Sequence, residues 1–276
     1  MKICRHLNAR SFLDRTEHWL LNSEAEYNVI LSVAHLLLTH DHPFQEPIYL
    51  ASVEQDRLVV GCAVLPPPDG LTLTTLPRAA VSLLVNDLAE YCDDLPDVAG
   101  PQREVTEFGK RWAKKRAVQA SEPHRSRWYA LEKVVDPVSP AKGELRLATL
   151  ADLDLVQSWA SSYARDVGAS VDVHAYFERR IRTNSLYLWD DEGPRALVAV
   201  SGLTPTAARV SGVYTPPEFR RRGYATATVA AVSRAVLETG RRMCVLFADQ
   251  TDPTPNSIYQ RIGYRPICET VGIQFS

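Results

Sequence analysis

The chain has few of the residues from which disulfide scaffolds and metal sites are built. Its five cysteines are odd in number, widely spaced and form no C-x-x-C pair, which argues against a disulfide framework or a zinc ribbon. The histidines His35, His40 and His42 gather near one helix end, but no H-x-x-x-H with a carboxylate accompanies them. We therefore expect reduced, buried thiols and no bound metal. The cysteines are Cys4, Cys62, Cys92, Cys244 and Cys268.

The sequence also lacks a strong net charge and a long apolar run. Its formal charge is −2, so no overall positive field favours nucleic acid or an anionic membrane. No apolar run approaches the ~20 residues that span a bilayer. Residues 1–20 carry charges at Arg5, Arg10 and Arg15, which do not suit the apolar core of a signal peptide. These features predict a cytoplasmic protein that binds neither membrane nor nucleic acid, and they leave open whether it is a monomer or a homodimer.

One local basic run leaves a nucleic-acid alternative open. Residues 110–127 contain several lysines and arginines, with Trp112 inside the run and Trp128 just after it. Trp112 shares an apolar helix face with Val105 and Phe108, however. A solvated helix face therefore explains the run better than base stacking does.

Apolar periodicity and turn residues divide the chain into two halves with the same order of elements. The first half is expected to have helices near residues 12–20 and at 27–39, strands at 48–53, 58–65 and 71–76, helices at 78–92 and 102–119, and a strand at 128–135. The second is expected to have a strand at 144–149, helices at 151–165 and 171–182, and strands at 186–189 and 196–203. Residues 136–143 hold two prolines and a glycine, so we place a linker at 138–143 between domains 1–137 and 144–276.

The stretch at residues 207–264 carries the clearest chemical signal. A strand ending near Tyr214 is stopped by Pro216 and Pro217, because proline cannot donate to a ladder. The turn R-R-R-G-Y-A-T-A then leads into a helix that ends near Gly240. Gly223 allows backbone N–H groups to approach a ligand at a helix N-terminus, where unpaired donors and the macrodipole favour phosphate. Three adjacent arginines add positive charge, so the turn predicts a phosphorylated ligand.

These residues resemble the GNAT superfamily of acyl-CoA-dependent N-acetyltransferases. The family's pyrophosphate turn, R/Q-x-x-G-x-G/A, is matched by Arg220, Gly223 and Ala225. The family's later N-P-x-S-N-x-I-Y-x-x-x-G-F/Y segment is matched at Pro253, Asn256, Ile258, Tyr259, Gly263 and Tyr264. Asp252 stands where the family has asparagine and Pro255 where it has serine, so pantetheine contacts at these positions depart from the pattern.

The resemblance implies a fold, a reaction and a set of site residues. The fold is α+β, with two tandem GNAT-like domains, each a mixed, mostly antiparallel sheet flanked by helices. The reaction is acetyl transfer from acetyl-CoA to a small-molecule or peptide amine by direct attack in a ternary complex. Tyr259 is implied as the general acid. The cofactor-binding residues are implied to be Val213, Tyr214, Thr215, Arg220, Arg221, Arg222, Gly223, Tyr224, Ala225, Thr226, Asn256 and Tyr259.

Three points stay open at this level. The general base has four candidates, His174, Asp249, Glu178 and Asp166. A non-catalytic acyl-CoA-binding regulatory protein is the alternative function, and Asp252 and Pro255 leave room for it. In the first half, the junction before the third helix is only Leu76, Pro77 and Arg78. We therefore expect that half to be a degenerate domain that binds no pyrophosphate.

Overall fold

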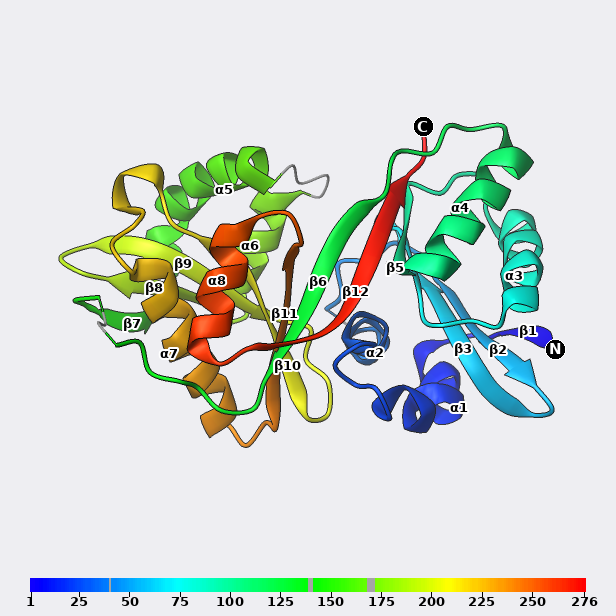
Figure 1. The fold of residues 1–276 in the computed structure, drawn as a ribbon, viewed down its shortest axis with the longest axis horizontal. Coiled ribbons are helices and arrows are strands. Elements are labelled where there is room, and N and C mark those ends of the chain that lie inside the picture. The colour runs from blue at the N-terminus through cyan, green and yellow to red at the C-terminus, as the bar shows by residue number, and fades with distance from the viewer. Residues whose placement is uncertain (40, 139–140, 168–171) are drawn as a thin grey trace. The chain divides into compact units, whose positions relative to one another are not determined.

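The computed structural model describes residues 1–39, 41–138, 141–167 and 172–276 (Figure 1). Contacts divide the chain into two compact units. Unit 1 contains Met1–Trp128, Asp249–Thr251 and Ile267–Ser276, and unit 2 contains Tyr129–Ala248 and Asp252–Pro266. Unit 1 is therefore built from segments that are distant in the sequence, whereas the two segments of unit 2 are separated by only three residues.

Unit 1 is a mixed sheet with helices on both faces. Its strands follow the order β1-β2-β3-β4-β5-β12, with residues 124–128 of β6 as a further contribution. Among the described strand pairs of unit 1, the β4–β5 pair is parallel, and the β1–β2, β2–β3, β3–β4 and β5–β12 pairs are antiparallel. The elements are β1 (Lys2–Arg5), α1 (Ala9–Leu21), α2 (Asn28–Leu36), β2 (Tyr49–Gln55), β3 (Leu58–Leu65), β4 (Leu71–Leu73), α3 (Arg78–Tyr91), β5 (Asp97–Pro101), α4 (Gln102–Arg116), β6 (His124–Leu131) and β12 (Arg265–Gln274).

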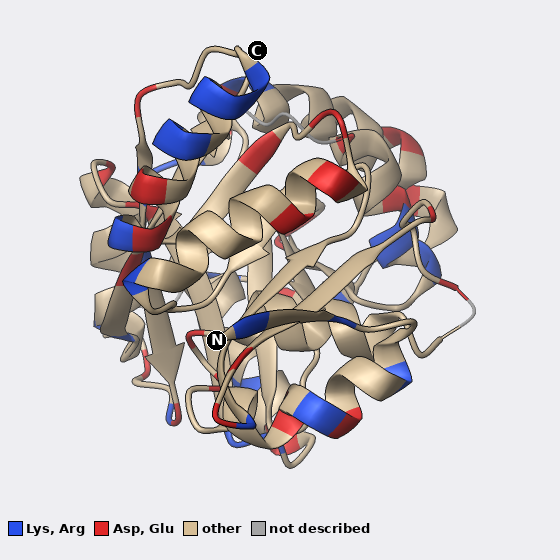
Figure 2. Ribbon diagram, turned by 90° about the vertical axis from the view of Figure 1, so that its right-hand side faces the viewer, with Lys and Arg blue, Asp and Glu red and all other residues tan. Residues whose placement is uncertain are grey.

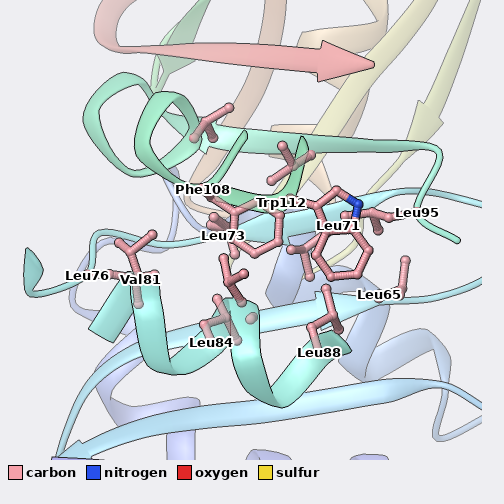
Figure 3. Close-up of a cluster of buried hydrophobic side chains, with 14 of the residues drawn as sticks. Leu65, Leu71, Leu73, Leu76, Val81, Leu84, Leu88, Leu95, Phe108 and Trp112 are labelled. Carbon is pink, nitrogen blue, oxygen red and sulfur yellow. The ribbon is translucent and has the colours of Figure 1, made fainter. Parts of the chain in front are cut away.

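Alternation along the strands of unit 1 feeds two separate cores. Tyr49, Ala51 and Val53 lie on one face of β2 and pack with α3 and α4, whereas Leu50 lies on the other face and packs with α1 and α2. This alternation is the period-two geometry of a strand covered on both sides. Figure 3 shows the first core, with Leu84 and Leu88 of α3 beside Phe108 and Trp112 of α4.

Unit 2 repeats this plan. Its strands follow the order β11-β10-β9-β8-β7, and residues 129–131 of β6 belong to this unit. The β10–β11 pair is parallel, and the pairs β7–β8, β8–β9 and β9–β10 are antiparallel. The elements are β7 (Glu144–Leu147), a 3₁₀ turn (Leu150–Asp152), α5 (Leu153–Val167), α6 (Val173–Arg182), β8 (Leu186–Asp190), β9 (Pro194–Ser201), β10 (Ala207–Tyr214), a second 3₁₀ turn (Pro217–Phe219), α7 (Tyr224–Glu238), β11 (Met243–Asp249) and α8 (Pro253–Ile262).

The two faces of the unit 2 sheet carry different helices. Leu197 and Ala199 of β9 pack with α5 and α6, and Val198 and Val200 pack with α7 and α8. Each core is therefore one sheet face closed by one helix pair. The prediction of an α+β fold with mixed, mostly antiparallel strands flanked by helices is confirmed.

The last strand of each half contributes to the unit of the other half. The C-terminal strand β12 pairs with β5 of unit 1, and the register runs from Thr270 opposite Pro101 to Gln274 opposite Asp97. Residues 129–131 of β6 come from the first half of the chain but belong to unit 2. The predicted domains 1–137 and 144–276 did not include this exchange, because local patterns show that a segment is a strand but not which strand it pairs with. A domain boundary at the linker stays a prediction, and residues 139–140 of that linker lie outside the described residues.

The basic run at 110–127 begins on the C-terminal part of α4 and ends on β6. Figure 2 shows lysines and arginines along the C-terminal part of this helix, and acidic residues near the end of α3. Trp112 is only 1% exposed and stacks on Phe108, so its ring is not available to a nucleic-acid base. The helices in the described ranges include none that is both long and apolar enough to cross a membrane.

Candidate functional site

In unit 2 the two parallel strands β10 and β11 separate partway along their length. Their register pairs are Ala207–Met243, Ala208–Cys244 and Arg209–Val245, and the ladder stops there. The remaining residues of β10, as far as Tyr214, stay paired with β9 on the other side. The edge of β10 that faces β11 therefore offers backbone groups to a ligand beyond Arg209.

A β-bulge lies in the part of β10 that pairs with β9 but no longer with β11. Ser211 pairs with Ala199 and Tyr214 with Leu197, so three steps on β10 oppose two on β9. Gly212 has φ +58°, and a β-carbon at this position would approach Phe177 Cε1 to 2.8 Å. Glycine is needed here both for its backbone conformation and for the close packing of α6.

The bulge changes the face on which the end of β10 presents its side chains. Ala208 and Val210 pack with α7 and α8, and strict alternation would place Tyr214 beside them. With the extra residue, Tyr214 instead packs with Trp159 and Tyr163 of α5. Of the predicted site residues, Val213 packs on the face of α7 and α8, and Tyr214 packs on the face of α5 and α6. The bulge also changes the direction of the backbone N–H groups in this part of the strand.

The arginine turn ends at the N-terminus of α7, as predicted. Gly223 is the residue before Tyr224 and has φ +84°, and no side chain caps the helix. The first turn-closing bond runs from the Ala227 N–H to the Gly223 carbonyl at 3.0 Å. The N–H groups of Tyr224, Ala225 and Thr226 precede that bond and have no intrahelical acceptor. Unpaired N–H groups at a helix N-terminus suit an anion.

The three arginines of the turn have different environments. Arg220 donates to the Thr215 carbonyl and to Asp166, whereas Arg221 and Arg222 are exposed and have no ion pair or hydrogen bond among the described residues. The hydroxyl of Thr215 is buried without a hydrogen-bond partner in the same part of the chain. A buried hydroxyl of this kind is satisfied when a ligand supplies a polar atom.

The tyrosine predicted as general acid lies in the core between the sheet and α7. Tyr259 is 6% exposed, and its ring centroid is 6.2 Å from that of Tyr129 and 6.0 Å from that of Tyr264. Burial raises the pKa of Tyr259, and the neighbouring hydroxyl of Tyr163 and carboxyl of Asp252 raise this pKa further. The hydroxyl therefore stays protonated at neutral pH.

Asn256, another predicted cofactor residue, is held by its own chain. Its Oδ1 accepts from the Tyr129 hydroxyl at 2.5 Å, and its Nδ2 donates to the Asp252 carbonyl at 2.5 Å. Asp252 caps α8, because its Oδ1 accepts from the Thr254 N–H at 2.9 Å. Aspartate and asparagine are both good N-cap residues, so aspartate can replace the family's asparagine in this role. Pro255 lies in the first turn of α8, where a missing N–H removes no intrahelical bond.

Sequence reasoning did not find the residues that α5 and α6 bring to the bulge. The Tyr176 hydroxyl lies 2.7 Å from Ser211 Oγ, which lies 2.8 Å from Ser201 Oγ. Tyr163 packs edge-on against Tyr214, and burial raises the pKa of Tyr163 to about 12. In the sequence these tyrosines look like ordinary members of apolar helix faces, so no local signal distinguishes them.

The four candidate bases all have partners within the chain. The ring of His174 is hydrogen-bonded to Gln157 and Ser161, Glu178 pairs with Arg182 at 2.7 Å, and Asp166 pairs with Arg220. Asp249 belongs to unit 1, and the hydroxyl and N–H of Thr251 lower its pKa. A lowered pKa weakens this carboxylate as a base. The structure therefore does not favour any of the four.

The equivalent junction in unit 1 is closed by an internal ion pair. The Leu76 N–H donates to Glu104 Oε1 at 3.1 Å, and Arg103 Nη2 donates to the Leu76 carbonyl at 2.5 Å. Glu104 is 3% exposed. Its carboxylate therefore takes the backbone donor that an anionic ligand would need at this junction. Among the described residues, no cluster of histidine, cysteine, aspartate or glutamate is suited to a metal ion.

Comparisons with known proteins agree with this geometry. The FR47-like protein family matches residues 191–273, the segment that holds the turn, α7 and Tyr259. A Drosophila protein of known structure has a TM-score of 0.73 at 15% identity and covers 99% of this chain and 98% of its own. A GNAT-family acetyltransferase from Colwellia psychrerythraea has a TM-score of 0.56 at 12% identity, with 100% and 99% covered. A tandem GNAT protein from the clavulanic acid biosynthesis pathway has a TM-score of 0.54 at 14% identity, with 100% and 98% covered.

The chain therefore has the GNAT fold, in a tandem arrangement that spans nearly its whole length. The resemblance drawn from the sequence is confirmed at this level. The comparison with curated protein sequences found no match.

Proposed function

We propose that the protein is an acyl-CoA-dependent N-acetyltransferase that moves an acetyl group from acetyl-CoA directly to an amine bound at the same time. One observation carries this proposal. The bulge of β10 lies where the ladder with β11 has already ended, and the same strand leads into the arginine–glycine turn of α7. A single segment thus offers backbone donors for a thioester and an anion site for a pyrophosphate.

The residues present fit coenzyme A. Arg221, Arg222 and the first N–H groups of α7 suit the pyrophosphate, because they combine unpaired charge with unpaired donors. The buried Thr215 hydroxyl lacks a partner among the described residues and suits a polar atom of the bound molecule. Val213, Tyr214 and the free edge of β10 suit the amide-bearing pantetheine arm.

In the proposed reaction the amine nitrogen bonds to the thioester carbonyl carbon, the C–S bond breaks, and the nitrogen gives up one proton to solvent. The chain supplies two functions to this reaction. Acetyl-CoA supplies an activated acyl group. A backbone N–H at the bulge, from Val213 or a neighbour, would donate to the carbonyl oxygen as negative charge develops on it. Tyr259 would donate its proton to the departing thiolate, since its hydroxyl is protonated and has no hydrogen bond among the described residues.

The energetics of this proton transfer are acceptable. Reference pKa values of about 10 for tyrosine and 8.5 for a thiol make the transfer uphill by roughly 2 kcal/mol. Burial raises the pKa of Tyr259 further, but apolar surroundings also raise the pKa of a thiolate beside it. The difference between the two groups therefore changes less than either value alone.

A calorimetric titration with acetyl-CoA, followed by measurement of thiol release with a panel of amines, tests the proposal. We expect binding at one site and release of coenzyme A with at least one amine. A protein that does not bind acetyl-CoA would contradict the whole proposal. Tight binding without turnover on any amine would instead indicate a regulatory acyl-CoA-binding protein.

A further inference from the structure

The three arginines of the turn look equivalent in sequence, but Arg220 is anchored at three points. Its Nε donates to the Thr215 carbonyl at 2.9 Å, and its Nη2 donates to Asp166 Oδ2 at 2.5 Å. Its guanidinium carbon lies 5.9 Å from the ring centroid of Tyr214. The guanidinium thus links the end of β10 to a carboxylate that is 54 residues away in the sequence.

Arg221 and Arg222 differ from Arg220 in this respect. Both are exposed, and among the described residues neither takes part in an ion pair or hydrogen bond. Arg221 has φ +62°, which turns the chain sharply between Arg220 and the start of α7. All three arginines are exposed, so the turn separates one arginine whose guanidinium is bonded to the chain itself from two that are available to a ligand.

The carboxylate partner of Arg220 lies on α5. Asp166 belongs to the last turn of this helix, and Tyr163, one turn earlier, packs on Tyr214 with ring centroids 6.2 Å apart. The end of α5 is therefore attached to the end of β10 twice, once by rings and once by charges. Under the function proposed above, α5 and α6 lie on the sheet face opposite α7 and border the acceptor amine.

We propose that Arg220 is a positioning residue that ties the C-terminal end of α5 to the end of β10, and that Arg221 and Arg222 carry the anion-binding charge of the turn. The role given to Arg221 and Arg222 rests on the proposed function. The role given to Arg220 concerns the free protein and rests on the contacts alone. Arg220 then controls how well the amine is placed, and the other two arginines control how tightly coenzyme A binds.

Hydrogen exchange in the free protein tests the tie. We expect Arg220→Gln, Asp166→Asn and the double variant to raise exchange equally at amides 163–167 and 213–215, because each removes the same contact. The Arg221→Gln/Arg222→Gln variant is the matched control and should leave exchange there unchanged. Equal protection in wild type and Arg220→Gln would show that the ion pair positions nothing.

Calorimetry with coenzyme A at about 0.05 M and about 0.5 M salt tests the division of roles. The Arg221→Gln/Arg222→Gln variant should weaken binding at least about tenfold at low salt and flatten the salt dependence. The Asp166→Asn/Arg220→Gln variant keeps the net charge of wild type, so we expect its affinity and salt dependence to stay within about twofold of wild type. If the Asp166→Asn/Arg220→Gln variant loses as much affinity as the Arg221→Gln/Arg222→Gln variant, Arg220 binds phosphate and the proposal is wrong.

With an amine that turns over, the tie has a kinetic readout as well. Asp166→Asn and Arg220→Gln should raise the KM for the amine several-fold while the Kd for coenzyme A stays nearly constant. Arg220→Lys should not rescue this KM, because an ammonium lacks the fork that reaches Thr215 and Asp166 together. A wild-type protein that does not bind coenzyme A refutes the proposed function, and the exchange experiment still decides the tie.

Discussion

Three tyrosines of one cluster differ in what their hydroxyls contact. The Tyr129 hydroxyl donates to Asn256, and the Tyr264 hydroxyl lies 2.8 Å from Ser233 Oγ. The Tyr259 hydroxyl has no such bond among the described residues, although its ring is buried with the other two. A hydroxyl that makes no hydrogen bond within the described residues can donate to a substrate without breaking a contact of the fold.

Replacing Tyr259 with phenylalanine should therefore affect chemistry rather than stability. We expect kcat to fall about 10²-fold, while acetyl-CoA affinity and the melting temperature change little, because only an interaction made in the transition state is removed. Steady-state kinetics, calorimetry and thermal melts measure the three quantities. Tyr264→Phe is the control, since it leaves Ser233 without its partner and should lower stability by about 1 kcal/mol with kcat nearly intact. An early-melting Tyr259→Phe variant with normal turnover would assign the residue to packing alone.

The raised pKa of Tyr259 also predicts the shape of the pH profile. A proton donor is lost when the pH exceeds its pKa, and burial moves this pKa above the usual value of about 10. The kcat of wild type should thus show no alkaline fall due to this group between pH 7 and about 10. Rate measurements across this range on wild type and Tyr259→Phe check this. A fall near pH 8 that is absent from the variant would contradict it.

A charge cluster at the start of the second half makes a separate prediction about stability. Arg146 donates to Asp152 at 2.8 and 2.9 Å and to Asp190 at 2.8 Å, and its guanidinium lowers the pKa of Asp152 to about 2. A depressed pKa stabilises the fold above the unfolded value of about 4, and this contribution is lost as the pH falls toward 2. Asp152→Asn should lower the unfolding free energy by about 1–2 kcal/mol at pH 7, less near pH 3 and little at pH 2. Thermal melts at each pH measure the difference, and a pH-independent difference would rule out the charge as its cause.

At the scale of elements, α7 has a glycine at each end. Gly223 has φ +84° and Gly240 has φ +90°, and β-carbons at either position would have ample space within the protein. Both positions disfavour other residues through backbone conformation alone. Only Gly223 lies beside Arg221, Arg222 and the unpaired N–H groups of the first turn of α7.

Valine at these two positions should therefore separate strain from binding. Gly223→Val and Gly240→Val should each cost about 1–2 kcal/mol of stability. Coenzyme A should raise the melting temperature of wild type and Gly240→Val, because a ligand that binds the native state stabilises it, but not that of Gly223→Val. Thermal melts with and without coenzyme A give the answer. A normal shift in Gly223→Val would mean that the pyrophosphate binds elsewhere.

For the whole molecule, the two units predict one coenzyme A per chain. In unit 1 the Leu76 N–H is already bonded to Glu104, and the Leu76 carbonyl accepts from Arg103. The turn before α3 also lacks glycine and ends at Pro77. A polar junction that is satisfied internally gains little from an anion.

Titration of the full chain should accordingly give a stoichiometry of one. Gly223→Val should remove all of the binding heat, and Glu104→Gln, which keeps a hydrogen-bond acceptor for Leu76, should leave the stoichiometry unchanged. Calorimetry at several protein concentrations measures both. A second equivalent that survives in Gly223→Val would place a site in unit 1 and overturn the prediction.

Local sequence patterns were sufficient for the elements themselves. The strand at 58–65 agrees with β3, and the helix at 78–92 ends one residue after α3. Apolar alternation, helical spacing and proline stops act over a few residues, so they can be read directly. The arginine–glycine turn was equally visible, because a positive φ before a helix favours glycine wherever the rest of the chain lies.

Only the tertiary structure decided which strands pair and which side chains contact each other. The sequence did not show that β12 completes unit 1, because strand pairing depends on distant residues. The bulge at Gly212 exists only relative to β9, and the distinction between Arg220 and its two neighbours depends on Asp166 arriving from α5. The sequence by itself determined that the protein has a turn suited to phosphate, since this needs only local backbone and charge. The structure decided which donors at that turn are free, since this depends on which groups the rest of the fold has already engaged.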